Sequence, residues 1–362
     1  MSTITPAPAP TATTDLTRLP AADLILPADA SEEDWLEVRS HGIGASDVSG
    51  ILQVEDPDVA RGVYKDRYQV WLDKTGQAED WEPDRDHPAH IGNLLEPVLR
   101  AELSERLGVK IHVPGLYANR DNPVFRCTVD GIHTDPDTGE LVLDEFKCNG
   151  GYGGLKLWAD EETTPLHPLS QVQYSMHLLG IKKAIIFALA GGNRFERRDI
   201  DYDPELGQMI AEEVTDFWDN YVVPRRQPDP TALSLDLLNE KFGLAVPGDE
   251  RSVDAVLALE LAEEWTAATA AEKAGKQRKE AIKARVKALA QTAPELTGPD
   301  GEPLFSVDND STLRKNDLIT EHPEVLEKYG KTETVLDVAA LKEADPQLWR
   351  AYRARSVKYL GK

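Results

Sequence analysis

Residues Cys127 to Lys147 read C-T-V-D-G-I-H-T-D-P-D-T-G-E-L-V-L-D-E-F-K. The end of this stretch, 141–147, is typical of a β-strand, whose side chains point alternately to the two faces of a sheet. One face therefore begins apolar and ends in Glu145 and Lys147, and the other face carries Asp144. The sequence predicts a strand that ends in charged side chains.

A second carboxylate is expected close to that end. The segment 135–139 has the composition of a turn, and 125–132 is predicted to form the strand that leads into it. In such a hairpin Asp130 lies beside the Glu145 end of the following strand. Two carboxylates and a lysine would then converge near strand termini.

Two interpretations of this cluster remain open from the residues alone. Buried carboxylates cost free energy unless they are compensated, and hard oxygen ligands of this kind suggest Mg²⁺ rather than zinc. The alternative is an ordinary pair of Glu145 and Lys147 on an exposed hairpin, which an isolated Glu-x-Lys triplet favours.

Composition limits the class of protein. The chain has 362 residues, 41% hydrophobic and 29% charged, which describes a soluble globular protein with one large domain or two smaller ones. A net charge of −24 argues against a generally basic nucleic-acid coat, although a locally basic channel remains compatible with it. The two cysteines, Cys127 and Cys148, predict no disulfide framework and fit a reducing cytoplasm.

The first 30 residues are rich in Pro, Ala and Thr, with neither a basic cluster nor a continuous apolar run. We expect a disordered N-terminal lead-in over 1–30 rather than a signal peptide. No apolar run is long enough for a membrane span.

A glycine-bearing turn, H-G-I-G-A-S-D at 41–47, follows a predicted helix over 31–39 that Ser31 caps. Amides at the start of the next helix, with Arg39 and Ser46, would form an anion site. A plain packing corner between two helices is an equally good interpretation of the turn.

The rest of the chain alternates helices and strands and predicts an α/β core. A boundary is expected near the Pro- and Arg-rich segment 224–230, which gives a core domain at 31–224 and a mainly helical extension at 225–362. The expected helices are 63–76, 91–107, 168–179, 205–221 and 252–291, and the further strands are 109–113, 183–190 and 195–200.

The stretch 271–290 within the long predicted helix has seven Lys or Arg against two Glu, a local charge of +5. A solvated helix face is the ordinary interpretation of such a stretch, and contact with a phosphate backbone is the alternative.

Several motifs occur in one order along the chain, and together they resemble the lambda exonuclease and YqaJ-type viral recombinase nucleases of the PD-(D/E)XK superfamily. The resemblance covers roughly residues 31–221. The motifs are Arg39 with G-A-S at 44–46, G-N-L-L-E ending at Glu96, C-T-V-D-G at 127–131, E-F-K-C at 145–148, and S-Q-V-Q-Y-S-M at 170–176.

The resemblance implies a restriction-endonuclease-like core, a central mixed sheet flanked by helices. It implies that Asp130, Glu145 and the backbone carbonyl of Asp144 bind Mg²⁺, for which Mn²⁺ can substitute, and that Glu96 helps to hold a second ion. By the same resemblance Lys147 orients or activates the attacking water, and Gln171 supports that lysine.

Arg39 and Ser46 match the positions that bind a 5′ phosphate in this family. Thr128 is expected to join them, although it replaces the family's serine and is followed by Val129 where the family has proline.

The function implied is a Mg²⁺-dependent 5′→3′ exonuclease of double-stranded DNA that works by two-metal hydrolysis. It would make 3′ single-stranded tails for phage-type recombination in a bacterial cytoplasm. The expected partners are the ends of double-stranded DNA and a single-strand annealing protein. The resemblance also implies a homo-oligomer, a trimer. The alternatives are an endonuclease or repair nuclease of the same superfamily and a non-catalytic DNA-binding or scaffold protein on the same fold.

Overall fold

The structure is a computed structural model. It describes residues 15–53, 65–78, 88–307 apart from 244, 247 and 249, 315–329 and 336–351. The chain divides into two compact units, Met1–Leu238 and Asn239–Lys362, and each is described by itself. The first unit carries the predicted core.

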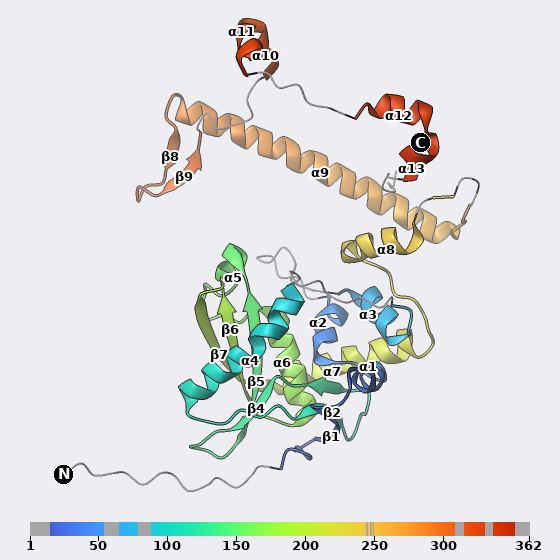
Figure 1. Cartoon of the computed structure of the whole chain (residues 1–362), viewed down its shortest axis with the longest axis vertical. Coiled ribbons are helices and arrows are strands. Elements are labelled where there is room, and N and C mark those ends of the chain that lie inside the picture. The colour runs from blue at the N-terminus through green and yellow to red at the C-terminus, as the bar shows by residue number, and fades with distance from the viewer. Residues whose placement is uncertain are drawn as a thin grey trace, which may run out of the picture. The chain divides into compact units, whose positions relative to one another are not determined.

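A mixed four-stranded sheet forms the centre of the first unit (Figure 1). Its order is β4-β5-β6-β7, and its only parallel pair among the described strands is β5 with β6. Parallel neighbours need a crossover connection, which helix α6 supplies. The predicted mixed sheet flanked by helices is confirmed. The strands are β4 (Gly131–Thr134), β5 (Leu141–Asn149), β6 (Lys183–Ala190) and β7 (Arg194–Asp201).

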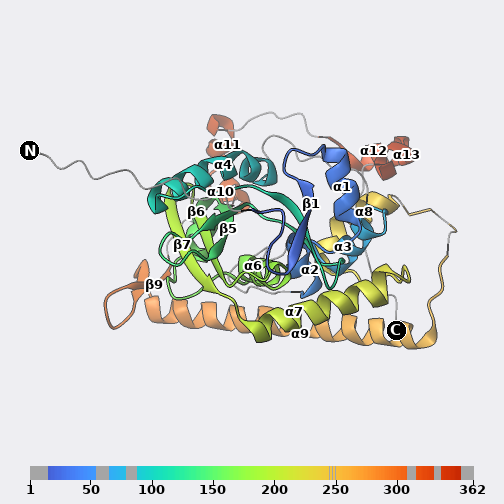
Figure 2. The ribbon, with the colours of Figure 1, turned by 90° about the horizontal axis from the view of Figure 1, so that it is seen from below.

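Helices cover both faces of this sheet. Figure 2 shows α4 (Pro88–Leu107) on one side and α6 (Leu166–Leu179) on the other. Phe146 of β5 is buried with Leu99 and Leu103 of α4, while Leu143 faces the larger core around α6. The period-two alternation of β5 therefore divides its side chains between two cores, as the sequence predicts.

A second sheet has the order β1-β2-β3, with β1 (Ala22–Pro27), β2 (Gly115–Asn119) and β3 (Arg126–Thr128). The disordered lead-in predicted over 1–30 is wrong for residues 15–30, since β1 pairs antiparallel with β2 and Leu19 and Ala22 are buried. Residues 1–14 lie outside the described residues. The partner strand lies some ninety residues later, so local composition could not indicate it.

The predicted strand 109–113 is also wrong. This segment contributes one isolated bridge, from His112 to Ile132, and the strand begins only at Gly115. Pro114 has no N–H for a ladder. The predicted strand 125–132 is divided at Val129 and Asp130 between β3 of one sheet and β4 of the other. Asp130 thus lies where the chain passes from sheet to sheet.

The remaining elements of the first unit are helical, and the unit continues past the boundary predicted at 224. Thr231 and Ser234 both donate to Asp66 Oδ2, at 2.8 and 2.7 Å between their hydroxyl oxygens and that atom, which anchors the following segment. The elements are α1 (Glu32–Ser40), η1 (Ala45–Asp47), α2 (Val48–Ile51), α3 (Arg67–Lys74), α5 (Gly151–Leu157), α7 (Pro204–Phe217), η2 (Trp218–Val222), η3 (Ala232–Ser234) and α8 (Leu235–Phe242), the last of which spans the division.

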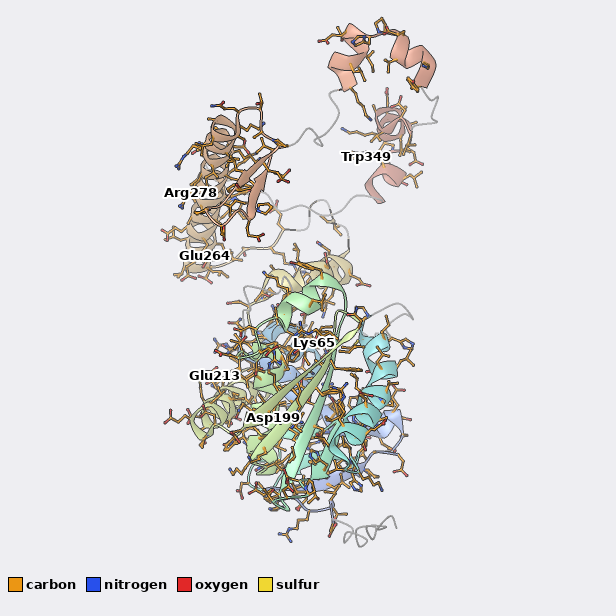
Figure 3. All side chains as sticks on the ribbon, turned by 90° about the vertical axis from the view of Figure 1, so that its left-hand side faces the viewer. Lys65, Asp199, Glu213, Glu264, Arg278 and Trp349 are labelled. Carbon is orange, nitrogen blue, oxygen red and sulfur yellow. The ribbon has the colours of Figure 1, made fainter. Side chains whose placement is uncertain are left out.

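The second unit is mainly helical, as predicted for the extension. Its longest element is α9 (Ala255–Ala290), and Figure 3 labels Glu264 and Arg278 on it. None of the described helices is long and apolar enough to cross a bilayer. The other elements are β8 (Glu295–Thr297), β9 (Pro303–Ser306), α10 (Lys315–Glu321), α11 (Glu324–Tyr329), α12 (Val338–Ala344) and α13 (Pro346–Ala351).

Candidate active site

Strand β5 and helix α6 bring together Glu145, Lys147 and Gln171, as the sequence predicts. Lys147 Nζ donates to Glu145 Oε1 at 2.5 Å and to Gln171 Oε1 at 2.9 Å. Glu145 is only 3% exposed, so the exposed-hairpin interpretation of the Glu-x-Lys triplet is wrong. Gln171 holds the ammonium from the side of α6.

Asp130 reaches the same strand from the crossing between the two sheets. Its Oδ2 accepts the N–H of Phe146 at 2.9 Å, which places the carboxylate beside the backbone between Glu145 and Lys147. Arg100 of α4 donates from Nε to the carbonyl of Asp130 at 3.1 Å. The break between β3 and β4 frees Asp130 for this position.

Glu96, in the first half of α4, is the third carboxylate. It pairs with Arg100, one helical turn further along. Burial and then the nearby Asp130 raise the pKa of the Glu96 carboxyl above its ordinary value. The effect of Asp130 on this pKa indicates that Glu96 lies on the same side of the sheet edge as Asp130 and interacts with it.

Burial makes the ionised forms of these carboxylates costly. Burial, followed by Asp130, raises the pKa of Glu145 to about 7, and Lys147 opposes the shift. Burial also raises the pKa of Asp130, against the effect of Lys147. Two neighbouring carboxylates with raised pKa values indicate that a further cation would stabilise their ionised forms.

The donor set fits a hard divalent cation, since it consists of carboxylate oxygens. Within the residues that the structure describes, however, no three His, Cys, Asp or Glu side chains converge closely enough to coordinate an ion among themselves. Glu96 and Glu145 pair instead with Arg100 and Lys147. An ion bound here would compete with these two basic side chains for the carboxylates.

Asp144 presents its side chain to the opposite face of β5. Its Oδ2 lies 2.8 Å from Nδ1 of His133, while its buried Oδ1 has no hydrogen-bond partner in the described structure. Asp144 therefore could contribute to the site only through its backbone carbonyl, and that role stays a prediction.

The three residues expected at the 5′ phosphate belong to one contact network. Arg39 Nη2 donates to Ser46 Oγ at 2.7 Å, and the Arg39 guanidinium lies 5.1 Å from the ring centroid of Trp35. The Trp35 indole donates to Thr128 Oγ1 at 3.2 Å. We call this network of Arg39, Ser46, Trp35 and Thr128 the Arg39 corner. Because Thr128 shortly precedes Asp130 in the chain, the corner is directly connected to the carboxylate cluster.

Backbone contacts fix the Arg39 corner to the core. The N–H of Ile43 donates to the carbonyl of Val124 at 2.8 Å, and the N–H of Arg126 donates to the carbonyl of Ile43 at 3.0 Å. The Tyr174 hydroxyl on α6 donates to the same Ile43 carbonyl at 2.9 Å. Helix α6 therefore positions both the corner and, through Gln171, the lysine.

Sequence reasoning missed three residues of the corner: Trp35, Asp47 and Lys74. Asp47 Oδ1 lies 3.3 Å from Arg39 Nη2, and Asp47 Oδ2 lies 2.8 Å from Lys74 Nζ. Trp35 and Arg39 are four residues apart on α1, a spacing that places them on one helix face and could have indicated their contact. No local pattern marks Lys74, which belongs to a different helix.

Comparison with known proteins covers the unit that holds this site. Residues 34–182 match the YqaJ-like viral recombinase domain. The uncharacterized protein YqaJ of Bacillus subtilis is 31% identical over 220 residues, which cover 59% of this chain and 65% of the length of that protein.

Among solved structures, an alkaline exonuclease (LHK-Exo) in complex with dAMP is similar at 18% identity with a TM-score of 0.44, over 58% of this chain and 97% of that one. A further structure of LHK-Exo, from Laribacter hongkongensis, gives a TM-score of 0.42 at 19% identity, over 58% and 97% of the two chains. A phage-related exonuclease from Haemophilus somnus is similar at 16% identity with a TM-score of 0.37, over 52% and 99% of the two chains.

Proposed function

We propose that the protein is a nuclease, a divalent-cation-dependent 5′→3′ exonuclease of double-stranded DNA, and the match of residues 34–182 to the YqaJ-like viral recombinase domain supports this proposal. Its product would be a duplex with 3′ single-stranded tails, the substrate of a single-strand annealing protein. Mg²⁺ is the proposed ion, with Mn²⁺ as a substitute.

One observation carries the proposal. Lys147 contacts both Glu145 and Gln171 at a point where Asp130 is fixed to the same strand. The Lys147 ammonium can offset the negative charge that grows on the phosphate oxygens during attack, and the carboxylate pair can hold a divalent cation that would do the same. Burying such a set of charges costs free energy, and catalysis gives a reason for that cost which a scaffold does not need.

The residues of the chain have separable roles. Asp130, Glu145 and the backbone carbonyl of Asp144 would hold one cation, and Glu96 would help to hold a second. A bound ion of this kind lowers the pKa of water and offsets charge on the leaving oxygen. The Lys147 ammonium orients the attacking water and stabilises the charge on the scissile phosphate. Gln171 keeps Lys147 in place, since its amide oxygen accepts from Nζ.

The Arg39 corner would bind the terminal 5′ phosphate. Arg39 offers guanidinium donors, and Ser46 and Thr128 offer hydroxyl groups, a combination suited to phosphate oxygens. Anchoring the end of one strand there would place the first phosphodiester of that strand at the carboxylate cluster. This arrangement supports end-dependent rather than internal cleavage.

Digestion of labelled DNA tests the proposal. We expect Mg²⁺ to support shortening of a linear duplex from its 5′ end, faster with a 5′ phosphate than with a 5′ hydroxyl, and EDTA to abolish it. The measurement is denaturing electrophoresis of duplexes labelled at either end, with a covalently closed circle as the matched control substrate. Cutting of the circle would replace the proposal with an endonuclease. Absence of cleavage with both Mg²⁺ and Mn²⁺ would favour the scaffold.

A further inference from the structure

Behind Arg39 lies a buried ion pair. Lys74 ends helix α3, Asp47 ends the turn η1, and both side chains are only 2% exposed. Burying two charges costs free energy that the attraction between them does not always recover. The pair therefore calls for an explanation beyond stability.

Asp47 connects this pair to the corner. Its Oδ2 accepts from Lys74 Nζ at 2.8 Å and from the N–H of Gly44 at 3.0 Å, while its Oδ1 accepts from Arg39 Nη2 at 3.3 Å. The same Arg39 nitrogen donates to Ser46 Oγ at 2.7 Å. Asp47 thus fixes both the guanidinium and the turn that carries Ser46.

The charges of the three side chains explain why Lys74 is needed. Arg39 and Asp47 alone would form a neutral pair that attracts an anion poorly. Burial lowers the pKa of Lys74 and the adjacent Asp47 opposes that shift, and with Lys74 protonated the three side chains keep a net charge of about +1 beside Ser46. Although burial opposes ionisation, Lys74 and Arg39 hold the pKa of the Asp47 carboxyl below its ordinary value, and its negative charge is therefore present.

We propose that Lys74 is a positioning residue, which neutralises Asp47 so that the charge of Arg39 remains available to a terminal phosphate. This inference rests on the proposed function. It assigns a role in substrate recognition to a lysine that no solvent-borne ligand reaches.

A charge-balance experiment on the full chain tests this role. Lys74→Met should raise KM for a 5′-phosphorylated duplex about tenfold, the loss of roughly one charge-assisted contact, with a much smaller change in kcat. The preference for a 5′ phosphate over a 5′ hydroxyl should be lost. The double variant Asp47→Asn/Lys74→Met removes both buried charges, leaves Arg39 as the net cation, and should regain the preference.

Arg67→Met is the matched control, since Arg67 lies on the same helix and pairs with Glu213 at 2.9 Å. Melting temperatures report folding separately from end preference. The role of Lys74 is contradicted if the wild type and Lys74→Met prefer phosphorylated ends equally strongly. It is also contradicted if the double variant folds but does not regain the preference. In both cases the proposed phosphate site itself would stand. A wild type that cleaves both ends equally overturns the phosphate site itself.

Helix α9 carries a second and independent inference. Large apolar side chains lie exposed along it, with Leu261, Trp265 and Ile282 between 42% and 53% exposed. The hairpin of β8 and β9 lies near its last turn, where Ala290 is buried and Val286 half-buried while Leu289 stays 71% exposed. Among the described residues of the second unit, most of the helix therefore has no covering element.

The spacing along α9 is that of a coiled coil. One stripe of side chains recurs at alternating steps of three and four residues, the period of a heptad seam. We call this stripe the α9 seam, and it consists of Ala258, Leu261, Trp265, Ala268, Glu272, Gly275, Lys279, Ile282, Val286 and Leu289.

The charges within the seam select the orientation of a partner helix. In a parallel pair of copies, Glu272 would face Glu272 and Lys279 would face Lys279, which is unfavourable at a buried position. In an antiparallel pair centred between residues 273 and 274, Glu272 faces Gly275, Lys279 faces Ala268 and Trp265 faces Ile282. Every large residue then meets an apolar or small one.

Charges beside the seam agree with the antiparallel register. Glu264 immediately precedes Trp265, and Arg285 immediately precedes Val286. These flanking positions approach each other in an antiparallel coiled coil, so that Glu264 of one copy meets Arg285 of the other, twice by symmetry. The surface is thus complementary to itself.

The geometry points to a second copy of this chain as the occupant of the α9 seam, bound antiparallel. Sedimentation equilibrium of the full chain should show self-association that Glu264→Arg or Arg285→Glu weakens about tenfold, because each change turns two attractions into repulsions. The combined variant Glu264→Arg/Arg285→Glu should restore it. Lys273→Glu, off the seam, is the control.

Self-association that neither Glu264→Arg nor Arg285→Glu weakens would overturn the inference. A wild type that stays monomeric at high concentration would also overturn it. Failure of the combined variant to recover, with its helix content intact by circular dichroism, would count equally against the antiparallel register.

Discussion

Replacement of Lys147 by methionine is expected to reduce cleavage of linear duplex by roughly 10²–10⁴-fold, the usual contribution of a positioned group of this kind. The reason is geometric: Lys147 Nζ lies between Glu145 Oε1 at 2.5 Å and Gln171 Oε1 at 2.9 Å. Methionine retains most of the length of the side chain but removes the positive charge. Single-turnover digestion of a 5′-labelled duplex measures the effect.

DNA binding should survive this change, because the Arg39 corner is untouched. Gel-shift titration without a divalent cation checks this, and retained affinity separates loss of chemistry from loss of substrate. Gln171→Leu is a milder variant for comparison. It leaves the charge of Lys147 but removes one hydrogen-bond partner of Lys147 Nζ, so its cleavage rate should fall less than that of Lys147→Met. A Lys147→Met protein as active as the wild type would remove Lys147 from the mechanism.

The second large effect concerns Glu145 and the stability of the protein without a bound cation. Burial and Asp130 raise the pKa of Glu145 from its ordinary 4.5 to about 7 in the folded state. Between these values the folded state binds more protons than the unfolded state, so stability must fall as pH rises. Across this window the cation-free protein should lose about 3 kcal/mol of unfolding free energy.

A divalent cation should reverse that loss. We expect Mg²⁺ to raise the melting temperature at pH 8, where the carboxylates are ionised, and to change it little at pH 5. Glu145→Gln should flatten the pH dependence, reduce the response to Mg²⁺ and abolish cleavage. Thermal unfolding from pH 5 to pH 8, in Mg²⁺ and in EDTA, measures all three.

Glu140→Gln provides the matched control, since Glu140 lies in the same hairpin and is exposed. This variant should behave like the wild type. Cation-free stability that stays level or rises over the window would show that Glu145 is ionised without cost, and would remove the main electrostatic argument for a cation at this site.

The strongly negative net charge of the protein is compatible with DNA binding at the proposed site. The net charge of −24 repels a phosphate backbone at long range, but exposed charges are screened beyond about 10 Å at ordinary ionic strength. Local groups that a phosphate can reach, such as Arg39, would then decide binding. The contact of the basic stretch 271–290 with DNA stays a prediction.

The sequence by itself determined the strand β5 and its two faces, because alternation of side chains is a property of the extended backbone and needs no partner. It likewise indicated helix α6 through its apolar pattern, and the Ser31 cap of α1, which donates and accepts within its own first turn. The family resemblance added roles for Glu96 and Gln171.

Only the tertiary structure decided what depends on segments far apart in the chain. Strand β1 exists because β2 pairs with it, the chain changes from one sheet to the other at Asp130 where a single strand was expected, and Lys74 neutralises Asp47 from another helix. Each of these contacts gains its free energy from burial or pairing with a distant partner, and the local sequence carries no record of that partner.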